Sequence, residues 1–547
     1  MSPRLRIAAL LGAMVIWFLP LGSFRLFNPD EGRYAEIARE MAASGDWVTP
    51  RLDALRYFEK PPLQYWATAA AYQVFGESEW SARLWAALTG FLGLLLTGWI
   101  GGRIYGATAG TLAALVQAGA LLYLGLARIL TLDMGLTASL ELALCGLLLL
   151  VQAEVQPERK DADARLGALL LALGVALAFL AKGLVGILIP GAVALLYLLW
   201  RRDWGLIQRA RPWWTLFALA VFAAPWVLLV ERRNPGFAQF FFVHEHFARF
   251  LTRVHQRYEP DWFFIPVLLL GFMPWTPLLP AIARSGWRDC RSRHGATVLL
   301  AIWVVFGLVF FSLSQSKLVP YILPLFPALA LLAGRSLAAP EAAALRRALL
   351  VSGAFWLILG LAVLLLWHEP GMAARLDIAS GPAGPAIAAG FLLAALLTVV
   401  AAWLAPRHGV VAAVATATLG SLTLLTVLLP AAKQMPGQRG MEALITAAAT
   451  QLQPDTPMYC VDDYEQSIPF YLKRPCTLVG YRGELDFGLR REPGRWIPDL
   501  AQFAVRWQRE TQALAVVRAE SYPELRRMGL PMRVIYTAPS LVAVVRK

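Results

Sequence analysis

Charged residues are scarce in this chain, because Asp, Glu, Lys and Arg together make up only 16% of its 547 residues. A typical soluble globular protein carries about 25% charged residues, so the composition excludes that class. In their place the chain has 58% hydrophobic residues, 20 tryptophans and a mean hydropathy of +0.56. These values are typical of a protein that lies mostly within a membrane.

Cysteine is also rare, with four residues in the whole chain. Cys145 falls inside an apolar run and Cys290 in a polar loop, and neither has the spacing of a metal site. The other two, Cys460 and Cys476, lie close together near the C-terminus. They form either a disulfide or two buried free thiols, depending on the compartment that the segment occupies.

The apolar residues gather in thirteen runs when the chain is read with a window of about 19 residues. They predict a multi-span α-helical membrane protein with about 13 transmembrane helices. The runs 166–181 and 183–200 are separated only by a tight turn at Lys182-Gly183. If they were one span, every later loop would change sides and the arginine-rich loops would lie outside the cytoplasm. The runs lie at 7–24, 80–102, 107–125, 133–151, 166–181, 183–200, 213–230, 263–282, 297–313, 319–334, 348–367, 382–404 and 409–430.

Arginine is concentrated in alternate loops, which the positive-inside rule assigns to the cytoplasm. The net charge of +14 therefore reflects orientation and contact with anionic lipid, and nucleic acid is not an expected partner. The first run lacks a small-x-small cleavage site, so it predicts an uncleaved anchor. The outer segments are then 25–79, 126–132, 231–262, 314–318, 368–381 and everything after 430.

The chain changes character after residue 430. Short strand-like stretches at 458–461, 513–517 and 541–545 alternate with helical stretches such as 441–452. We predict a transmembrane domain over 1–430, with extracytoplasmic loops 25–79 and 231–262, and a small extracytoplasmic α/β domain over 431–547. Cys460 and Cys476 would then lie in an oxidising compartment.

Adjacent carboxylates follow the first apolar run, at Asp30 and Glu31 in the sequence Asn-Pro-Asp-Glu-Gly-Arg-Tyr. Desolvating two carboxylates at the end of a membrane helix is costly, so a functional role is the better interpretation. The residues 35–41 that follow predict an amphipathic helix on the membrane surface, with Ile37 and Met41 on its apolar face.

Two further acids occur on the same predicted face. Glu59 and Lys60 precede a double proline, which would hold an acid and a base rigidly at the level of the headgroups. Asp133 begins the fourth span and is either a helix N-cap or a functional acid. Arg128 lies five residues before it, so a simple i, i+4 ion pair does not explain the two.

The outer segment 231–262 contains His244 and His246 on either side of Glu245. On a helix the two histidines point to different faces, which disfavours a metal site made from this tripeptide alone. The segment is either a plain interfacial helix or, through one histidine together with Glu59, a site for a divalent ion.

The run 314–327 begins as a polar outer loop and enters a span that several prolines interrupt. Lys317 either extends to the headgroups or, together with Tyr321, holds the phosphate of a lipid. Prolines in such a span free backbone groups that a ligand could satisfy.

These motifs together resemble polyprenyl-phosphate-dependent glycosyltransferases of the GT-C superfamily. The resemblance rests on Asp-Glu-Gly-Arg-Tyr-Ala-Glu-Ile-Ala, Phe-Glu-Lys-Pro-Pro-Leu, Leu-x-Asp, His-Glu-His-Phe-x-Arg-Phe and Ser-Lys-x-x-x-Tyr-x-Leu-Pro, in this order on one predicted face. Within the superfamily the chain most resembles the transferases that add 4-amino-4-deoxy-L-arabinose (aminoarabinose) to lipid A. Protein mannosyltransferases share several of the motifs.

The resemblance implies an enzyme of the bacterial inner membrane that takes its sugar from undecaprenyl phosphate at the periplasmic face. Transfer to the phosphates of lipid A would give resistance to cationic peptides and polymyxin. The alternatives are a protein O-glycosyltransferase that uses a polyprenyl-phosphate sugar and, less well supported, a transporter. The implied residues are Asp30 and Asp133 for catalysis, Arg33, Lys60, Lys317 and Tyr321 for the carrier phosphate, and Glu59 and His246 for a zinc or magnesium ion.

Overall fold

The computed structural model of the chain describes residues 12, 14–155, 160–248, 258–291, 295–338, 342–368, 383–434 and 436–547. The chain forms two compact units. The first comprises Met1–Leu21, Glu59–Gln64 and Arg83–Ala431, and the second comprises Gly22–Phe58, Tyr65–Ala82 and Ala432–Lys547. The predicted boundary at residue 430 lies where the chain enters the second unit for the last time. Much of the outer segment 25–79 also belongs to that second unit.

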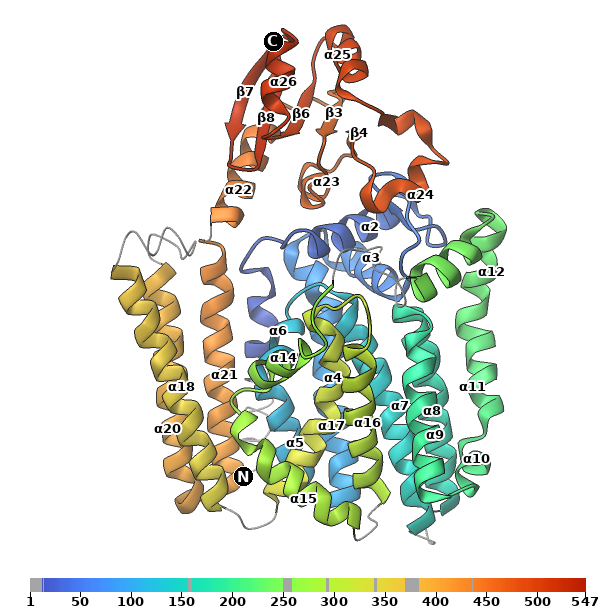
Figure 1. The fold of residues 1–547 in the computed structure, drawn as a ribbon, viewed down its shortest axis with the longest axis vertical. Coiled ribbons are helices and arrows are strands. Elements are labelled where there is room, and N and C mark those ends of the chain that lie inside the picture. Colours follow the sequence, from blue (N-terminus) through green and yellow to red (C-terminus); the bar gives the residue numbers. More distant parts are fainter. Residues whose placement is uncertain are drawn as a thin grey trace. The chain divides into compact units, whose positions relative to one another are not determined.

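Long apolar helices make up the first unit, which confirms the multi-span α-helical fold (Figure 1). Among the described residues, nine helices are long and apolar enough to cross a membrane, and a bent pair would make ten. The expected number of about 13 is therefore not reached within this part of the chain. The nine helices are Glu79–Tyr105 (α4), Leu132–Glu154 (within α7), Lys160–Lys182 (α8), Gly205–Arg233 (α10 to α12), Gly295–Ser312 (α16), Val319–Leu337 (η6 and α17), Ala343–His368 (within α18), Ala383–His408 (α20) and Val410–Ala432 (α21).

The remaining predicted spans are shorter, broken or partly outside the described residues. Residues 107–125 form two helices, α5 (Ala107–Gly119) and α6 (Leu121–Leu126), because Ala120 between them is extended. The N–H of Leu121 donates to the carbonyl of Met273 at 3.2 Å, so this donor stays satisfied inside the protein. The run 183–200 forms α9 (Val185–Arg201), with 17 residues. Of the run 7–24, residues 12 and 14–24 are described, and η1 (Leu19–Gly22) lies at its end.

The predicted span 263–282 is bent where it was expected to be continuous. Phe264–Gly271 (α14) and Thr276–Arg291 meet at an angle of 105°. The second arm consists of η5 (Thr276–Leu278) and α15 (Leu279–Arg291). Pro274 and Pro277 occupy the bend, and a proline cannot donate the backbone hydrogen bond that would continue the helix.

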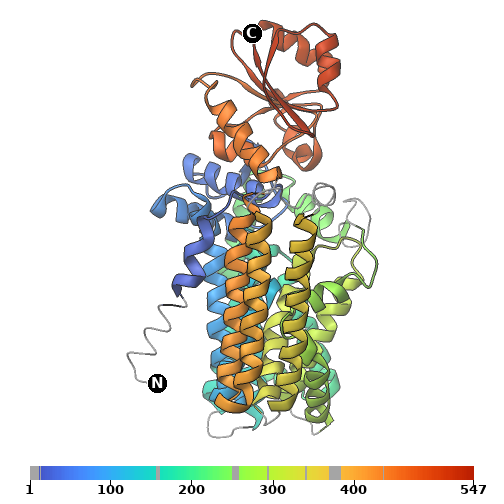
Figure 2. The same ribbon diagram turned by 90° about the vertical axis from the view of Figure 1, so that its left-hand side faces the viewer.

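Three of the long helices pack side by side: α18 (Ala342–His368), α20 (Ala383–His408) and α21 (Val410–Ala432) (Figure 2). Their contact is built on aromatic and small residues. Trp356 stacks on Phe391 with ring centroids 6.0 Å apart, and both lie in one cluster with buried Ala394 and Leu424. Small residues such as alanine let helix backbones approach closely in a membrane, where the hydrophobic effect does not drive helix association.

The second unit contains a mixed α/β fold, which confirms the class predicted for the C-terminal region. Its six-stranded sheet has the order β5-β4-β3-β6-β8-β7. Neighbours β5, β4, β3 and β6 are parallel, whereas β8 is antiparallel to both β6 and β7. The strands are β3 (Met458–Val461), β4 (Thr477–Val479), β5 (Trp496–Ile497), β6 (Leu514–Arg518), β7 (Met532–Thr537) and β8 (Leu541–Arg546).

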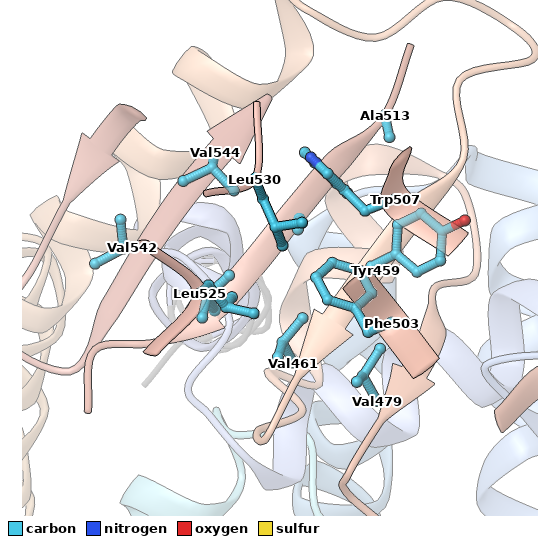
Figure 3. Close-up of a cluster of buried hydrophobic side chains, with 12 residues drawn as sticks. Tyr459, Val461, Val479, Phe503, Trp507, Ala513, Leu525, Leu530, Val542 and Val544 are labelled. Atoms are coloured by element: carbon cyan, nitrogen blue, oxygen red, sulfur yellow. The ribbon is translucent and has the colours of Figure 1, made fainter. Parts of the chain in front are cut away.

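One face of this sheet is covered by α25 (Leu500–Arg509) and α26 (Tyr522–Arg527), which close an apolar core (Figure 3). Aromatic rings fill its centre. The ring centroid of Trp507 lies 5.5 Å from that of Phe503 and 6.2 Å from that of Tyr459. The Tyr459 hydroxyl reaches the edge of the core and donates to Glu510 Oε1 at 2.7 Å, so its polar end is satisfied.

Cys460 on β3 and Cys476 before β4 form a disulfide, which decides between the two alternatives left open by the sequence. They are 16 residues apart, and closing a loop of this size stabilises a domain by about 3 kcal/mol through the unfolded state.

We expect the double variant Cys460→Ser, Cys476→Ser to lose about this much in free energy of unfolding. Differential scanning calorimetry would measure it, with Cys290→Ser as the control that leaves the transition in place.

Candidate active site

A cavity of about 130 Å³ in the first unit is lined by charged and aromatic side chains. Charged groups are costly to bury in a membrane protein and usually mark a functional site. The lining brings Lys60 and Tyr321, both predicted from the sequence, next to residues that the sequence did not single out. The lining residues are Lys60, Leu136, Lys182, Val185, Glu245, Phe310, Phe311, Ser314, Ser316 and Tyr321.

Lys182 forms one of the two ion pairs at the cavity. It ends α8, and its ammonium group pairs with Asp133, in the first turn of α7 (Leu132–Val155). The same Nζ lies 4.4 Å from the centroid of the Tyr321 ring, in η6 (Val319–Leu325). Asp133, predicted as a second acid, thus has a lysine as its partner. Arg128, whose guanidinium lies 4.8 Å from the Trp17 ring centroid and donates to the Leu124 carbonyl, is placed elsewhere.

The second ion pair joins Lys60 and Glu245, with Nζ and Oε2 3.5 Å apart. Glu245 lies in η4 (Gln239–Ala248), where the ring of neighbouring His244 also contacts its carboxylate at 3.2 Å. Its side chain is 1% exposed and that of Lys60 is 12% exposed. A buried carboxylate of this kind needs a cation beside it, because an unpaired buried charge is strongly destabilising.

Ser316 adds a hydroxyl group to the cavity wall. Its Oγ is buried and has no hydrogen-bond partner within the part of the chain that the structure describes. Buried hydroxyl groups are normally hydrogen-bonded, so this one is available to a ligand in the cavity. Lys317, the next residue, does not contribute to the lining: it is buried, and its Nζ donates to the Glu259 carbonyl at 2.8 Å and lies 3.4 Å from Asp261 Oδ1.

Asp30 and Arg33 belong to the second unit, at the start of α2 (Asp30–Ser44). Arg33 is buried, and its two terminal nitrogens lie 2.8 Å from Asp30 Oδ1 and 2.6 Å from Glu484 Oε2. Burial alone would lower the pKa of Arg33, but its neighbours, Tyr57, Glu484 and Asp30 among them, raise that pKa well above the ordinary value. Arg33 therefore stays charged. The Asp30 side chain remains 42% exposed, so one of its oxygens is open to a substrate.

Glu31, the other acid of the pair, has a structural contact. Its carboxylate accepts a hydrogen bond from the backbone N–H of Phe27 at 2.9 Å, just before α2 begins. This arrangement fixes the entry of the chain into the helix. The expected helix over 35–41 is confirmed within α2, and Ile37 and Met41 are both buried. Glu36 and Arg39 are buried as well, and they are paired at 2.7 Å.

A glycine allows the start of α2 to lie directly against α23 (Ser467–Leu472). A Cβ at Gly32 would be 2.3 Å from Ser467 Oγ, so no other residue fits at this contact. Asn28 Oδ1 also accepts from the backbone N–H of Ser467 at 3.1 Å. Asp30 and Arg33 are therefore held in place by the C-terminal part of the chain, and no short-range pattern in the sequence indicates this.

Behind α2, two carboxylates hold the tight turn between β1 (Arg51–Leu52) and β2 (Leu55–Arg56). Asp53 and Ala54 both have positive φ, at 58° and 60°, a conformation that non-glycine residues adopt rarely. Glu40 accepts from the N–H of Ala54 at 3.0 and 2.9 Å. Asp53 Oδ1 accepts from the N–H of Cys476 at 2.6 Å. The turn is thereby tied both to α2 and to the disulfide.

Asp53 makes the stability of the protein pH-dependent. Burial raises its pKa from 3.8 to about 8, although the hydrogen bond from Cys476 opposes this. The folded state binds the Asp53 proton more tightly than the unfolded state does. The contribution of Asp53 to the free energy of unfolding is therefore complete below about pH 4 and is lost as the pH rises towards 8. Between these values we expect the free energy of unfolding of the wild type to fall, relative to that of Asp53→Asn, by about 1.4 kcal/mol per pH unit. Thermal unfolding at a series of pH values would measure the difference, and parallel curves for the two proteins would contradict it.

The residues expected to bind a divalent ion do not form a complete ligand set within the described part of the chain. No group of three or more His, Cys, Asp or Glu residues able to hold a metal ion is found there. The side chain of His246 lies outside the described residues, and the nearby carboxylate of Glu245 is already paired with Lys60. The described residues alone do not complete a metal site here, and the expected site at Glu59 and His246 stays a prediction.

Comparison with known families places this architecture in a class. Residues 4–241 match the dolichyl-phosphate-mannose-protein mannosyltransferase family, and residues 444–546 match the aminoarabinose transferase C-terminal domain. The multi-span fold with an α/β C-terminal region, together with these two matches, is that of a membrane glycosyltransferase with a polyprenyl-phosphate donor.

Similarity to individual proteins extends over nearly the whole chain. The chain is 32% identical to an undecaprenyl phosphate-α-4-amino-4-deoxy-L-arabinose arabinosyl transferase of Pseudomonas fluorescens, over 96% of this chain and 95% of that protein. A transferase of the same name from Edwardsiella ictaluri is 32% identical over 87% of this chain and 86% of its own length. The structure of ArnT from Cupriavidus metallidurans bound to undecaprenyl phosphate is 34% identical and has a TM-score of 0.90, covering 100% of this chain and 98% of that one. The chain belongs to the aminoarabinose transferase family.

Proposed function

We propose that this protein transfers 4-amino-4-deoxy-L-arabinose from undecaprenyl phosphate to a phosphate group of lipid A, at the periplasmic face of the bacterial inner membrane. The observation that carries the proposal is the cavity with two lysines, Lys60 and Lys182, each beside one carboxylate. Two cations at one site suit a phosphate group, whereas their carboxylate partners keep the net charge of the cavity lining close to zero.

The lysines stabilise the departing carrier. An ammonium group has three donors, so Lys182 can keep Asp133 as its partner and still donate to an oxygen of undecaprenyl phosphate. Lys60 Nζ also donates to the Glu59 carbonyl at 2.8 Å, and would exchange this bond for one to the phosphate. The hydroxyl of Ser316, which has no partner among the described residues, is a further donor at this cavity. As the bond between the anomeric carbon and the carrier oxygen breaks, negative charge grows on the phosphate, and donors already in place lower the barrier.

In this proposal Asp30 acts on the acceptor or on the sugar. A lipid A phosphate is already an oxyanion, so it can attack the anomeric carbon without a strong base. The exposed oxygen of Asp30 then orients the acceptor or the sugar ammonium group, and Arg33 holds the carboxylate in position. The sugar is bonded to lipid A through a new carbon–oxygen bond, and undecaprenyl phosphate leaves with the electrons of the old one.

Four of the predicted binding residues have a weaker basis. Tyr321 lies against Lys182 and would position that ammonium group rather than bind phosphate itself. Lys317 would need to release the Glu259 carbonyl to reach a phosphate. A metal ion at Glu59 and His246 also stays a prediction, and treatment with a chelator followed by an activity assay and metal analysis would test it.

Mass spectrometry of lipid A tests the proposal directly. The intact chain, or its Asp30→Asn variant, is supplied to a Gram-negative host that lacks its own aminoarabinose transferase but makes the carrier-linked sugar. Aminoarabinose on the lipid A phosphates with the intact chain alone would support the proposal. Unmodified lipid A, with the protein shown to be inserted, would contradict it and favour transfer to a protein hydroxyl, the activity that the mannosyltransferase match over 4–241 suggests.

A further inference from the structure

Arginines of the second unit gather where two segments of the chain meet. One segment is the hairpin of β1 and β2, and the other is 482–495, around α24 (Asp486–Leu489). The two pack directly on each other, since a Cβ at Gly488 would lie 2.8 Å from the carbonyl oxygen of Arg56. We call the arginines of these two segments the arginine patch: Arg51, Arg56, Arg482, Arg490, Arg491 and Arg495.

Each carboxylate in contact with the patch is shared by two arginines. Asp486 lies 2.7 Å from Arg490 and 3.5 Å from Arg482. Glu492 is shared in the same way by the two arginines of the hairpin, at 3.0 and 3.4 Å. Glu484, which also belongs to the segment, is engaged in the ion pair at the start of α2. The patch therefore has an excess of positive charge.

The guanidinium groups of the patch are accessible and held in place. The side chains of Arg490 and Arg482 are 70% and 49% exposed. Arg495 is exposed and has no ion pair among the described residues. Arg482 and Arg491 each lie over an aromatic ring, with 4.0 and 3.8 Å between the guanidinium carbon and the ring centroid. Stacking on a ring orients a guanidinium group while its N–H edge can still donate.

The patch adjoins Asp30 through a short chain of ion pairs. Glu484 follows Arg482 closely in the sequence and lies 2.6 Å from Arg33, which in turn lies 2.8 Å from Asp30 Oδ1. In the proposed function Asp30 acts on the acceptor or on the sugar. Positive charge beside this residue suits a part of the acceptor that is negatively charged but does not react.

We propose that the arginine patch binds a phosphate of the acceptor lipid A other than the one that receives the sugar. The inference rests on the proposed function, in which lipid A is the acceptor. A guanidinium group presents a planar pair of donors that matches two phosphate oxygens. A phosphate monoester carries close to two negative charges at neutral pH, whereas the phosphodiester of a phospholipid carries one, so an excess of arginine favours the monoester. Holding this phosphate would orient a large acceptor for attack by its other phosphate.

Native mass spectrometry of the full-length protein, without the sugar donor, tests the partner. Lipid A, or monophosphoryl lipid A that lacks one phosphate, is added to the wild type and to the variant Arg490→Gln, Arg495→Gln. We expect the wild type to bind lipid A about tenfold more tightly than monophosphoryl lipid A. The variant should bind both with the lower affinity, so the loss of the phosphate and the loss of the arginines do not add. Arg526→Gln, Arg527→Gln is the matched control, because both arginines are exposed in the same unit and lie outside the patch.

Two binding results would overturn the proposal. One is additive losses, or wild-type affinity for lipid A in the variant. The other is phosphatidylglycerol that binds as tightly as lipid A and depends on the same arginines, which would assign the patch to phospholipid. An equal loss of affinity in the control variant would likewise contradict a specific role of the patch.

Initial rates with the carrier-linked sugar separate this inference from the proposed function. At a series of lipid A concentrations, the variant Arg490→Gln, Arg495→Gln should show a KM for lipid A about tenfold higher and an unchanged kcat. A lower kcat with an unchanged KM would contradict the assignment. If no protein transfers the sugar but the binding results hold, the proposed function fails and the patch remains a lipid A site.

Discussion

Replacing Asp30 by Asn is expected to reduce sugar transfer about a thousandfold, with the protein still folded and inserted. The side chain keeps its size, and its 42% exposure means that no buried charge is lost. Arg33 also keeps Glu484 as an ion-pair partner at 2.6 Å, so the start of α2 remains tied to the C-terminal part of the chain. The loss would therefore report on the reaction and not on folding.

The measurement is the initial rate of aminoarabinose transfer to lipid A with purified protein and carrier-linked sugar. Asp455→Asn serves as the control, because Asp455 is an exposed carboxylate of the same unit. Thermal unfolding of both variants should match that of the wild type. Wild-type turnover in Asp30→Asn would remove Asp30 from the catalytic role, whereas a lowered unfolding temperature would assign it to structure.

The sequence predicted the helices of the first unit well where each one is a single continuous run. The runs 80–102 and 382–404 correspond to α4 and α20, because length and hydrophobicity alone decide such helices. Hydrophobicity does not report breaks that another segment stabilises. Ala120 interrupts the run 107–125. The N–H group of Leu121, which follows it, donates to the carbonyl of Met273, a residue far away in the sequence.

The candidate site was predicted only in part, because the sequence shows which charged residues are unusual but not which residues they contact. Asp30, Lys60 and Asp133 stand out because a charge next to an apolar run is rare. Lys182 satisfies the same criterion, yet its position before Gly183 makes it look like the turn of a hairpin. Its pairing with Asp133 becomes evident only when α7 and α8 are packed together. Likewise, the contact of Gly32 with Ser467 joins segments at opposite ends of the sequence.

Lys182→Met should have the second large effect, with a loss of transfer of about a hundredfold or more. Methionine keeps the length of the side chain and its contact with the Tyr321 ring, but it cannot donate to the carrier phosphate. The substitution also leaves Asp133 without its cation, although the Asp133 side chain is only 11% exposed. Breaking such a buried pair costs about 3 kcal/mol, so the single variant should be less stable as well as less active.

The double variant Lys182→Met, Asp133→Asn separates the two effects. Removing both charges together should restore most of the stability, since neither is left buried alone. If Lys182 holds the carrier phosphate, transfer stays low in the double variant, whereas a purely structural ion pair would let activity recover with stability. Lys160→Met, at the exposed opposite end of α8, is the matched control and should retain wild-type transfer and stability. Recovery of transfer in the double variant would assign the phosphate to Lys60 and Ser316 without Lys182.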